Sequence, residues 1–89
     1  MMYPFMTLDD NTVIVHSEMH EDGSVVVCCE RPIRADFKTA YCKIPGYVWY
    51  DVENYSTDEL NELTRVLKTV AHLIIKYSRN GGFLDAAGF

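Results

Sequence analysis

The sequence lacks the features that direct a chain to a membrane or to secretion. No stretch reaches the ~18 consecutive apolar residues of a membrane-spanning helix. The start, MMYPFMTLDD, has neither the basic flank nor the long apolar core of a signal peptide. Cysteine is also scarce, with three residues and no spacing typical of a disulfide framework. We therefore expect a cytoplasmic protein with free thiols and no association with a membrane.

Recognisable catalytic patterns are missing as well. The sequence has no nucleophile beside a base, no paired carboxylates typical of a cleft, and no glycine-rich phosphate loop before a helix. His16 and His20 would lie ~13 Å apart on an extended strand, too far to share one metal ion. We therefore expect no enzyme activity, no cofactor and no bound metal.

Linkers, repeats and low-complexity segments are absent too, so residues 1–89 are expected to form one compact domain. The net charge of −5 is unevenly distributed: residues 1–62 carry 12 acidic and 4 basic side chains, and residues 63–89 carry 1 and 4. An acidic excess argues against general nucleic-acid binding and favours a partner with a basic surface.

Two β-branched runs, NTVIVHSEM and GSVVVCCER, flank Asp22-Gly23 and predict a β-hairpin. A two-residue loop would pair His16 with Cys29, whereas a three-residue loop with a left-handed glycine would pair His16 with Cys28. We favour the three-residue loop because it gathers an apolar set on one face. That core face would hold Val13, Val15, Met19, Val25, Val27 and Cys29, and the other face would hold Ile14, His16, Glu18, Val26, Cys28 and Glu30.

The segments FKTAYCKI and YVWYDVE, joined through Pro45-Gly46, predict two further strands, and Pro32 marks the connection that precedes them. A two-residue loop at Pro45-Gly46 divides their side chains between two faces. One face would carry Phe37, Tyr41, Val48, Tyr50 and Val52, and the opposite face would carry Ala40, Cys42, Ile44, Tyr47, Trp49, Asp51 and Glu53.

A helix is predicted from about Thr57 to about Asn80. Ser56 and Glu59 have the spacing of a capping box, and Gly81-Gly82 provides a stop. Apolar residues recur at helical spacing and predict a broad stripe that packs on the sheet. The stripe consists of Leu60, Leu63, Val66, Leu67, Val70, Leu73, Ile74 and Tyr77.

Two surfaces are candidates for binding. A single helix covers one face of the sheet, so we expect the second face to expose aromatic side chains within an acidic rim, a composition typical of protein-binding patches. The alternative is that the terminal segments YPFM and GFLDAAGF, or a second copy of the chain, cover this face. The candidate partner-binding residues are Glu18, Tyr47, Trp49, Asp51 and Glu53. The other candidate is a basic ridge on the outer side of the helix, made of Arg65, Lys68, His72, Lys76 and Arg79.

The order of a hairpin, further strands and a capped helix is similar to that of small antitoxin domains that pair with messenger-RNA-cleaving toxins. The shared features are DGSVVV and the helix opening STDELNEL, and the resemblance is limited to these stretches. It implies inhibition of another protein by direct binding.

Together these patterns predict an α+β domain: an antiparallel sheet of three to four strands in two hairpins, followed by one long C-terminal helix packed on one face. We expect a non-enzymatic intracellular protein of the inhibitor type, antitoxin-like or a phage-encoded blocker of a nucleic-acid enzyme, whose acidic and aromatic sheet face binds a basic surface of another protein. The alternative is a nucleic-acid-binding or regulatory module that acts through the basic ridge. A homodimer through the apolar C-terminal half of the helix is a further alternative.

Overall fold

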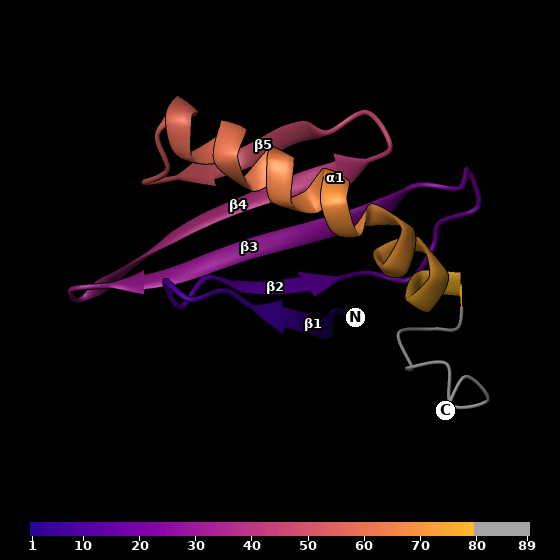
Figure 1. Cartoon of the computed structure of the whole chain (residues 1–89), viewed down its shortest axis with the longest axis horizontal. Helices are drawn as coiled ribbons and strands as arrows, with labels where there is room; N and C mark the ends of the chain where they lie inside the picture. The colour runs from indigo at the N-terminus through magenta and orange to yellow at the C-terminus, as the bar shows by residue number, and fades with distance from the viewer. Residues whose placement is uncertain (80–89) are drawn as a thin grey trace.

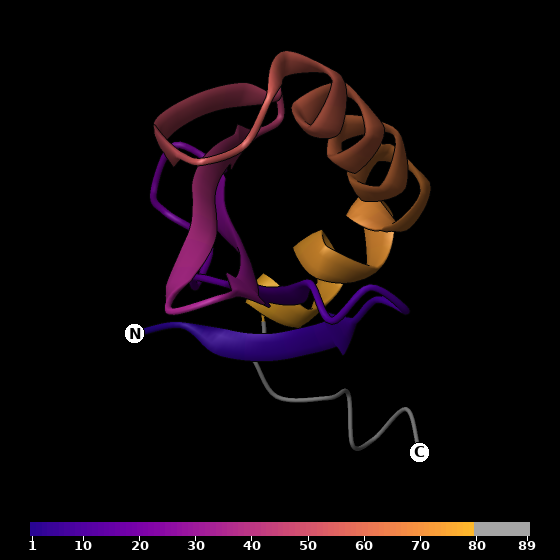
Figure 2. The ribbon, with the colours of Figure 1, turned by 90° about the vertical axis from the view of Figure 1, so that its left-hand side faces the viewer.

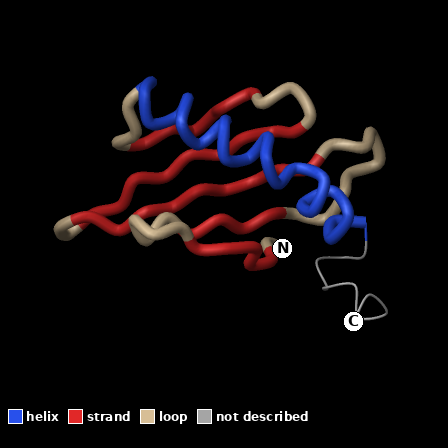
Figure 3. Tube along the Cα trace, in the orientation of Figure 1, coloured by secondary structure: helices blue, strands red, loops and turns tan. Residues whose placement is uncertain are grey.

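A computed structural model describes residues 1–79 as a five-stranded antiparallel sheet followed by one helix (Figure 1 and Figure 3). The strands lie in the order of the sequence, so each pairs only with its neighbours along the chain. The elements are β1 Tyr3–Thr7, β2 Val13–His16, β3 Val25–Ile33, β4 Asp36–Ile44, β5 Val48–Glu53 and α1 Thr57–Arg79. The predicted α+β class is confirmed, but the sheet has five strands and not three to four.

The additional strand is β1, which is short and contains Pro4. A tight turn brings it back along β2: the Leu8 N–H donates to the Thr12 carbonyl at 2.8 Å, and Asn11 has a φ of 72°. The Asp10 carboxylate accepts the Thr12 N–H at 3.0 Å, as aspartates do in such turns. β1 therefore forms an edge of the sheet, a position where proline is tolerated.

The helix begins where the capping box predicts. The Ser56 N–H donates to Glu59 Oε1 at 2.9 Å, and the Glu59 N–H donates to Ser56 Oγ at 3.2 Å. The described helix ends at Arg79, so the predicted end at Asn80 and the predicted stop at Gly81-Gly82 lie outside the described residues.

The sheet curls around the helix, which crosses it diagonally from β5 towards β1 and β2 (Figure 2). The face turned to the helix, here the concave face, holds the core. The buried core residues are Ile14, Val25, Val27, Cys29, Cys42, Ile44, Leu63, Leu67 and Ile74. In the described part of the chain no element packs on the opposite, convex face (Figure 2).

The hairpin of β2 and β3 has the predicted turn but not the predicted register. The His20 N–H donates to the Ser24 carbonyl at 2.8 Å across a three-residue loop, and Gly23 has the expected positive φ of 85°. Closer to the strands, the Ser17 N–H donates to the Val26 carbonyl at 2.8 Å. Between the pair His20–Ser24 and the pair Ser17–Val26, the β2 side of the hairpin moves by three residues and the β3 side by two. The β2 side therefore contains one extra residue, which forms a β-bulge.

The bulge falls at Glu18-Met19 and is held by the helix. The Met19 N–H donates to the Ser78 carbonyl of α1 at 3.2 Å, and Ser17 Oγ accepts the Val26 N–H at 3.0 Å. The register consequently moves by one residue from the predicted one, and His16 lies opposite Val27 instead of a cysteine.

This shift exchanges the two faces of β2. Ile14 and His16, predicted on the open face, are fully buried under the helix. Val13 and Val15, predicted in the core, lie on the convex face, because adjacent strand residues point to opposite faces. The prediction for β2 is therefore wrong, whereas Val25, Val27 and Cys29 of β3 are in the core as expected.

Two further hairpins pair β4 with β3 and β5 with β4. β3 continues through Pro32, the predicted connection, to a two-residue turn at Arg34-Ala35. Pro32 is tolerated because β3 extends there beyond β2, whose pairing ends at Val13 opposite Glu30. The register of β4 and β5 is the predicted one up to Tyr50, opposite Tyr41.

A second irregularity follows at Asp51, which has a φ of 49°. The register between β4 and β5 shifts there, so Glu53 lies opposite Thr39. Because Thr39 belongs to the convex face, Glu53 does not share the face of Trp49 as predicted.

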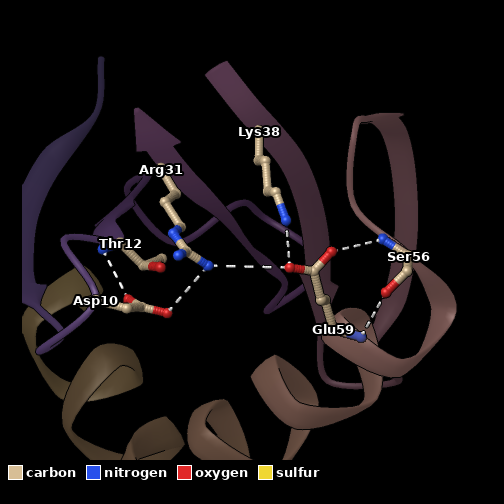
Figure 4. A network of polar contacts seen from close by, with 6 residues as sticks. All are labelled: Asp10, Thr12, Arg31, Lys38, Ser56 and Glu59. Atoms are coloured by element: carbon tan, nitrogen blue, oxygen red, sulfur yellow. Dashed lines mark hydrogen bonds and ion pairs between the residues drawn. The ribbon is translucent and has the colours of Figure 1, made fainter. Parts of the chain in front are cut away.

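A polar network fastens the first turn of the helix to the concave side of β3 and β4 (Figure 4). The Lys38 ammonium binds Glu59 Oε2, and Arg31 Nη1 lies 3.9 Å from the same oxygen and 3.7 Å from Asp10 Oδ2. The hydrogen bond from Lys38 holds the pKa of Glu59 below its ordinary value. Glu59 thus joins the sheet to the helix cap at Ser56.

Candidate interaction surface

The candidate surface is the convex face, where side chains form rows across the sheet. Residues directly opposite each other on paired strands point to the same face. The pairings therefore define an apolar row that crosses all five strands, made of Pro4, Val15, Cys28, Tyr41 and Tyr50. On one side runs an acidic row of Thr7, Val13, Glu30, Thr39 and Glu53, and on the other a lysine row of Val26, Lys43 and Val48.

The β4–β5 end of this face exposes large apolar side chains. Val48 is 60% exposed, Phe37 49% and Tyr50 38%. The Tyr41 and Tyr50 rings stack with centroids 5.6 Å apart and an interplanar angle of 25°. Val48 and Tyr50 lie near the β4–β5 turn, whereas Phe37 lies beyond the acidic row, towards the other end of β4.

Negative charge surrounds the two tyrosines. The pKa of Tyr41 is raised by Cys28, by partial burial, and by the carboxylates of Glu30 and Asp51. The pKa of Tyr50 is raised by partial burial and by Asp51. Both hydroxyls thus remain protonated donors near neutral pH, in a field that attracts cations.

Lys43 provides the basic charge of the lysine row. Its ammonium lies 3.7 Å from Asp22 Oδ2, and both side chains are at least half exposed. Exposed pairs of this kind contribute about 0–1 kcal/mol, so Lys43 exchanges partners at little cost.

Two of the five predicted binding residues lie on the concave side. Trp49 Nε1 donates to Thr64 Oγ1 of the helix at 2.8 Å, and Tyr47 packs against the core with Lys68 Nζ 5.3 Å from its ring centroid. The prediction that these aromatic rings form the open face is wrong, since the helix covers them. The open face uses Tyr41 and Tyr50 instead.

The predicted acidic residues are placed differently from one another. Glu18 lies in the bulge, and its Oε1 accepts a hydrogen bond from the Tyr3 hydroxyl at 3.2 Å. Asp51 and Glu53 remain beside the tyrosines of the convex face, Asp51 in the β5 bulge and Glu53 in the acidic row. The convex face therefore carries acidic and aromatic residues, but most of them are not the predicted ones.

The basic ridge has the expected exposure. Its members, Arg65, Lys68, His72, Lys76 and Arg79, are all exposed along α1. Arg65 Nη1 forms an ion pair with Glu62 Oε2 at 3.1 Å, and Lys68 lies over the Tyr47 ring. Part of its charge is therefore engaged by the protein itself.

The cysteines are structural. All three are free and buried. Burial raises the pKa of Cys29 to about 12 and that of Cys42 to about 11. Burial also raises the pKa of Cys28, which is 8% exposed and lies opposite Tyr41. Almost no thiolate exists at neutral pH, so none of them is an activated nucleophile.

His16 is a buried polar residue that the sequence did not indicate. Its Nδ1 lies 2.8 Å from the Ser17 carbonyl and 3.0 Å from Ser78 Oγ, and because a carbonyl only accepts, Nδ1 is the donor to Ser17. Nε2 has no hydrogen-bond partner in the described structure, and the Tyr3 and Phe5 rings lie against the imidazole, with centroids 5.9 and 6.2 Å away. Among residues 1–79, no three His, Cys, Asp or Glu side chains are grouped to hold a metal ion.

Both edges of the sheet are irregular. β1 has Pro4 and a register shift between Pro4 and Met6, and β5 has the bulge at Asp51. Such irregularities discourage the addition of another strand. Neither edge is therefore suited to pairing with a further strand.

The comparisons with known proteins add no further assignment. No family model matches the sequence. No curated protein and no solved structure matches it significantly. Within the described residues, no helix is long and apolar enough to cross a membrane.

Proposed function

We propose that this protein is a non-enzymatic binding domain whose convex sheet face occupies a basic surface of another protein. One observation carries the proposal: the apolar row crosses all five strands and ends in the stacked, partly exposed pair Tyr41 and Tyr50. Aromatic side chains on an otherwise uncovered apolar area are typical of the centre of protein interfaces.

The charges around that row support a basic partner. Glu30 and Glu53 lie on the same face, Asp51 lies close to the tyrosines, and Lys43 is already paired with Asp22. Lysine or arginine side chains of a partner would meet carboxylates at the rim and aromatic rings at the centre.

An inhibitor-type role suits this chemistry. Enzymes that act on nucleic acids present basic surfaces, and a small acidic domain that occupies such a surface blocks the substrate. We place the protein inside the cell, because its three free thiols are compatible with a reducing compartment.

The test is capture of binding proteins from the source cell by the full chain, compared with two variants. Tyr50→Ala combined with Val48→Thr should reduce recovery of the partner at least ~10-fold, since removal of central interface side chains costs about 2 kcal/mol or more. Lys68→Ala combined with Lys76→Ala changes the basic ridge only and should leave recovery unchanged.

A protein recovered equally with all three baits would contradict the proposal. For a partner whose recovery depends on the face, calorimetry should show weaker binding as salt rises, because charge contributes to the contact. Affinity independent of salt would reject the basic-partner part of the proposal.

A second candidate is nucleic-acid binding through the basic ridge, and the exposure of all five of its side chains favours it. Under this alternative, a fluorescent single-stranded RNA should bind the wild-type chain, and Lys68→Ala with Lys76→Ala should abolish binding while Tyr50→Ala has no effect. The ion pair of Arg65 and the position of Lys68 over Tyr47 make it the weaker candidate.

A further inference from the structure

The charges of the convex face are arranged with a symmetry that suits a second copy of the chain. Glu30 and Glu53 stand one pleat to one side of the apolar row, on β3 and β5, with Thr39 between them on β4. Lys43 stands one pleat to the other side, also on β4. Lys43 and Thr39, which lies between the two glutamates, are therefore at equal distances from the apolar row, on opposite sides of it.

A two-fold axis along the apolar row would make these groups meet. Such an axis packs two convex faces together, keeps each strand over its own counterpart, and places the acidic row of one copy on the lysine row of the other. Lys43 of the second copy then lies over Thr39, with Glu30 and Glu53 each ~4.8 Å to either side, the spacing of neighbouring strands. The arrangement occurs twice, and the apolar rows contact each other around β4, where the axis meets both convex faces.

Other surfaces are less suited to a second copy. The basic ridge would face another basic ridge across a two-fold axis, so that like charges repel. The edges carry Pro4 and the bulge at Asp51, which hinder strand pairing between copies.

The size of the face indicates a weak association. Five strands spaced ~4.8 Å apart and three rows ~7 Å apart span only ~19 by ~14 Å. This is well below the ~800 Å² per partner of a standard stable interface. A dimer of this kind is readily displaced by a partner that binds more tightly.

We propose that a second copy of this chain covers the convex face when no other partner is bound, with its Lys43 between Glu30 and Glu53. This inference rests on the proposed function in that the same face binds protein. It adds regulation: self-association and partner binding exclude each other, so the dimer limits the free binding surface at high concentration.

Sedimentation equilibrium of the full chain tests the proposal directly. The wild-type chain should pass from monomer to dimer between ~10 µM and ~1 mM, the range of a weak interface. Lys43→Glu should weaken dimerisation at least ~10-fold, and so should Glu30→Lys with Glu53→Lys, because each places like charges in contact. Lys68→Ala on the basic ridge is the matched control and should dimerise as the wild type does.

Mixing the two charge variants supplies the decisive result. Lys43→Glu with Glu30→Lys/Glu53→Lys restores opposite charges across the axis, so a heterodimer should form where neither variant dimerises alone. Circular dichroism of each variant should match the wild type, since the substituted side chains lie on the surface.

Three results overturn the inference: a wild-type monomer throughout this range, a dimer insensitive to both charge variants, or a mixture that stays monomeric although both variants are folded. These results leave the capture experiment unaffected. A partner lost with Tyr50→Ala and Val48→Thr would still support the proposed function, and a charge-dependent dimer without such a partner would reject the proposed function alone.

Discussion

The two faces of the sheet come from the same five strands, yet they differ in what covers their side chains. On the concave face, the helix covers the apolar residues, and polar groups such as Trp49 Nε1 find partners on it. On the convex face, no described element packs on the row from Pro4 to Tyr50, although Cys28 within that row is buried. Apolar character alone therefore does not identify a core, because the position of the single helix decides which face is structural and which is free to bind.

Truncation of a core side chain should give the largest loss of stability and so separate the concave face from the convex face most clearly. Leu67 of α1 is fully buried in the core between the helix and the concave face. Leu67→Ala should lower the free energy of unfolding by about 2–5 kcal/mol, because a cavity replaces packed atoms. Urea unfolding followed by circular dichroism measures the change, and a loss below about 1 kcal/mol would show that the helix is not packed as described.

Adjacent cysteines offer a matched comparison of the two faces. Cys29→Ser places a hydroxyl in the core opposite Ala40 and Ile14, and should cost about 1–3 kcal/mol. Cys28→Ser lies on the convex face, on which no described element packs, and should cost less than about 1 kcal/mol. Equal losses in urea unfolding would contradict the assignment of the two thiols to opposite faces.

The attachment of the helix to the concave face should depend on pH. The pKa of Glu59 is lowered, chiefly by the hydrogen bond from Lys38, so its contribution to stability is complete above the pKa of the unfolded chain and is lost as pH falls through the folded pKa. Glu59→Gln should destabilise the protein by about 0.5–1 kcal/mol at pH 7.

The difference between this variant and the wild type should shrink as pH falls through the lowered pKa of Glu59, because the carboxylate then becomes protonated. Urea midpoints measured at a series of decreasing pH values follow this convergence. A stability difference that stays constant with pH would show that the charge of Glu59 does not fasten the helix.

The smallest effect on the free energy of unfolding is expected on the convex face. Val48→Thr should change the free energy of unfolding by no more than about 0.5 kcal/mol, because the side chain is 60% exposed and packs on little. The same substitution belongs to the variant expected to lose partner binding. A large loss of stability from Val48→Thr would mean that this end of the convex face serves the fold and not a partner.

Much of the fold was predictable from local signals. The capping box at Ser56 and Glu59, the glycine turn at Gly23 and the Pro45-Gly46 connection all appear as expected. β1 was not predicted, because a five-residue strand with a proline has little strand signal and depends on the turn that returns it to β2. The bulge at Glu18-Met19 depends on the carbonyl of Ser78, 59 residues away, which no local pattern specifies.

The candidate site was predicted in composition but only partly in identity. The side chains of β4 and β5 separate into the expected two sets, yet the set with Trp49 faces the helix and the set with Tyr41 and Tyr50 does not. A prediction of the two-residue turn at Arg34-Ala35 would assign the faces correctly. This turn pairs Cys29 of the core with Ala40, and Ala40 shares its face with Trp49, so Trp49 must face the helix. Pro32 obscured that turn, because proline is rare within a strand.

The bulge at Glu18-Met19 sets different tolerances to changes in chain length within one loop. Adding a residue at the tip, between Glu21 and Gly23, lengthens a loop whose closing pair lies beyond it and leaves the alternation of β2 intact. Adding or removing one residue between Ser17 and Met19 shifts the register of β2 by one residue. The side chains of β2 that are buried under the helix would then face solvent, and those that face solvent would be buried. The tip should therefore tolerate insertion of a single residue, whereas its stem a few residues away should tolerate only changes of two residues.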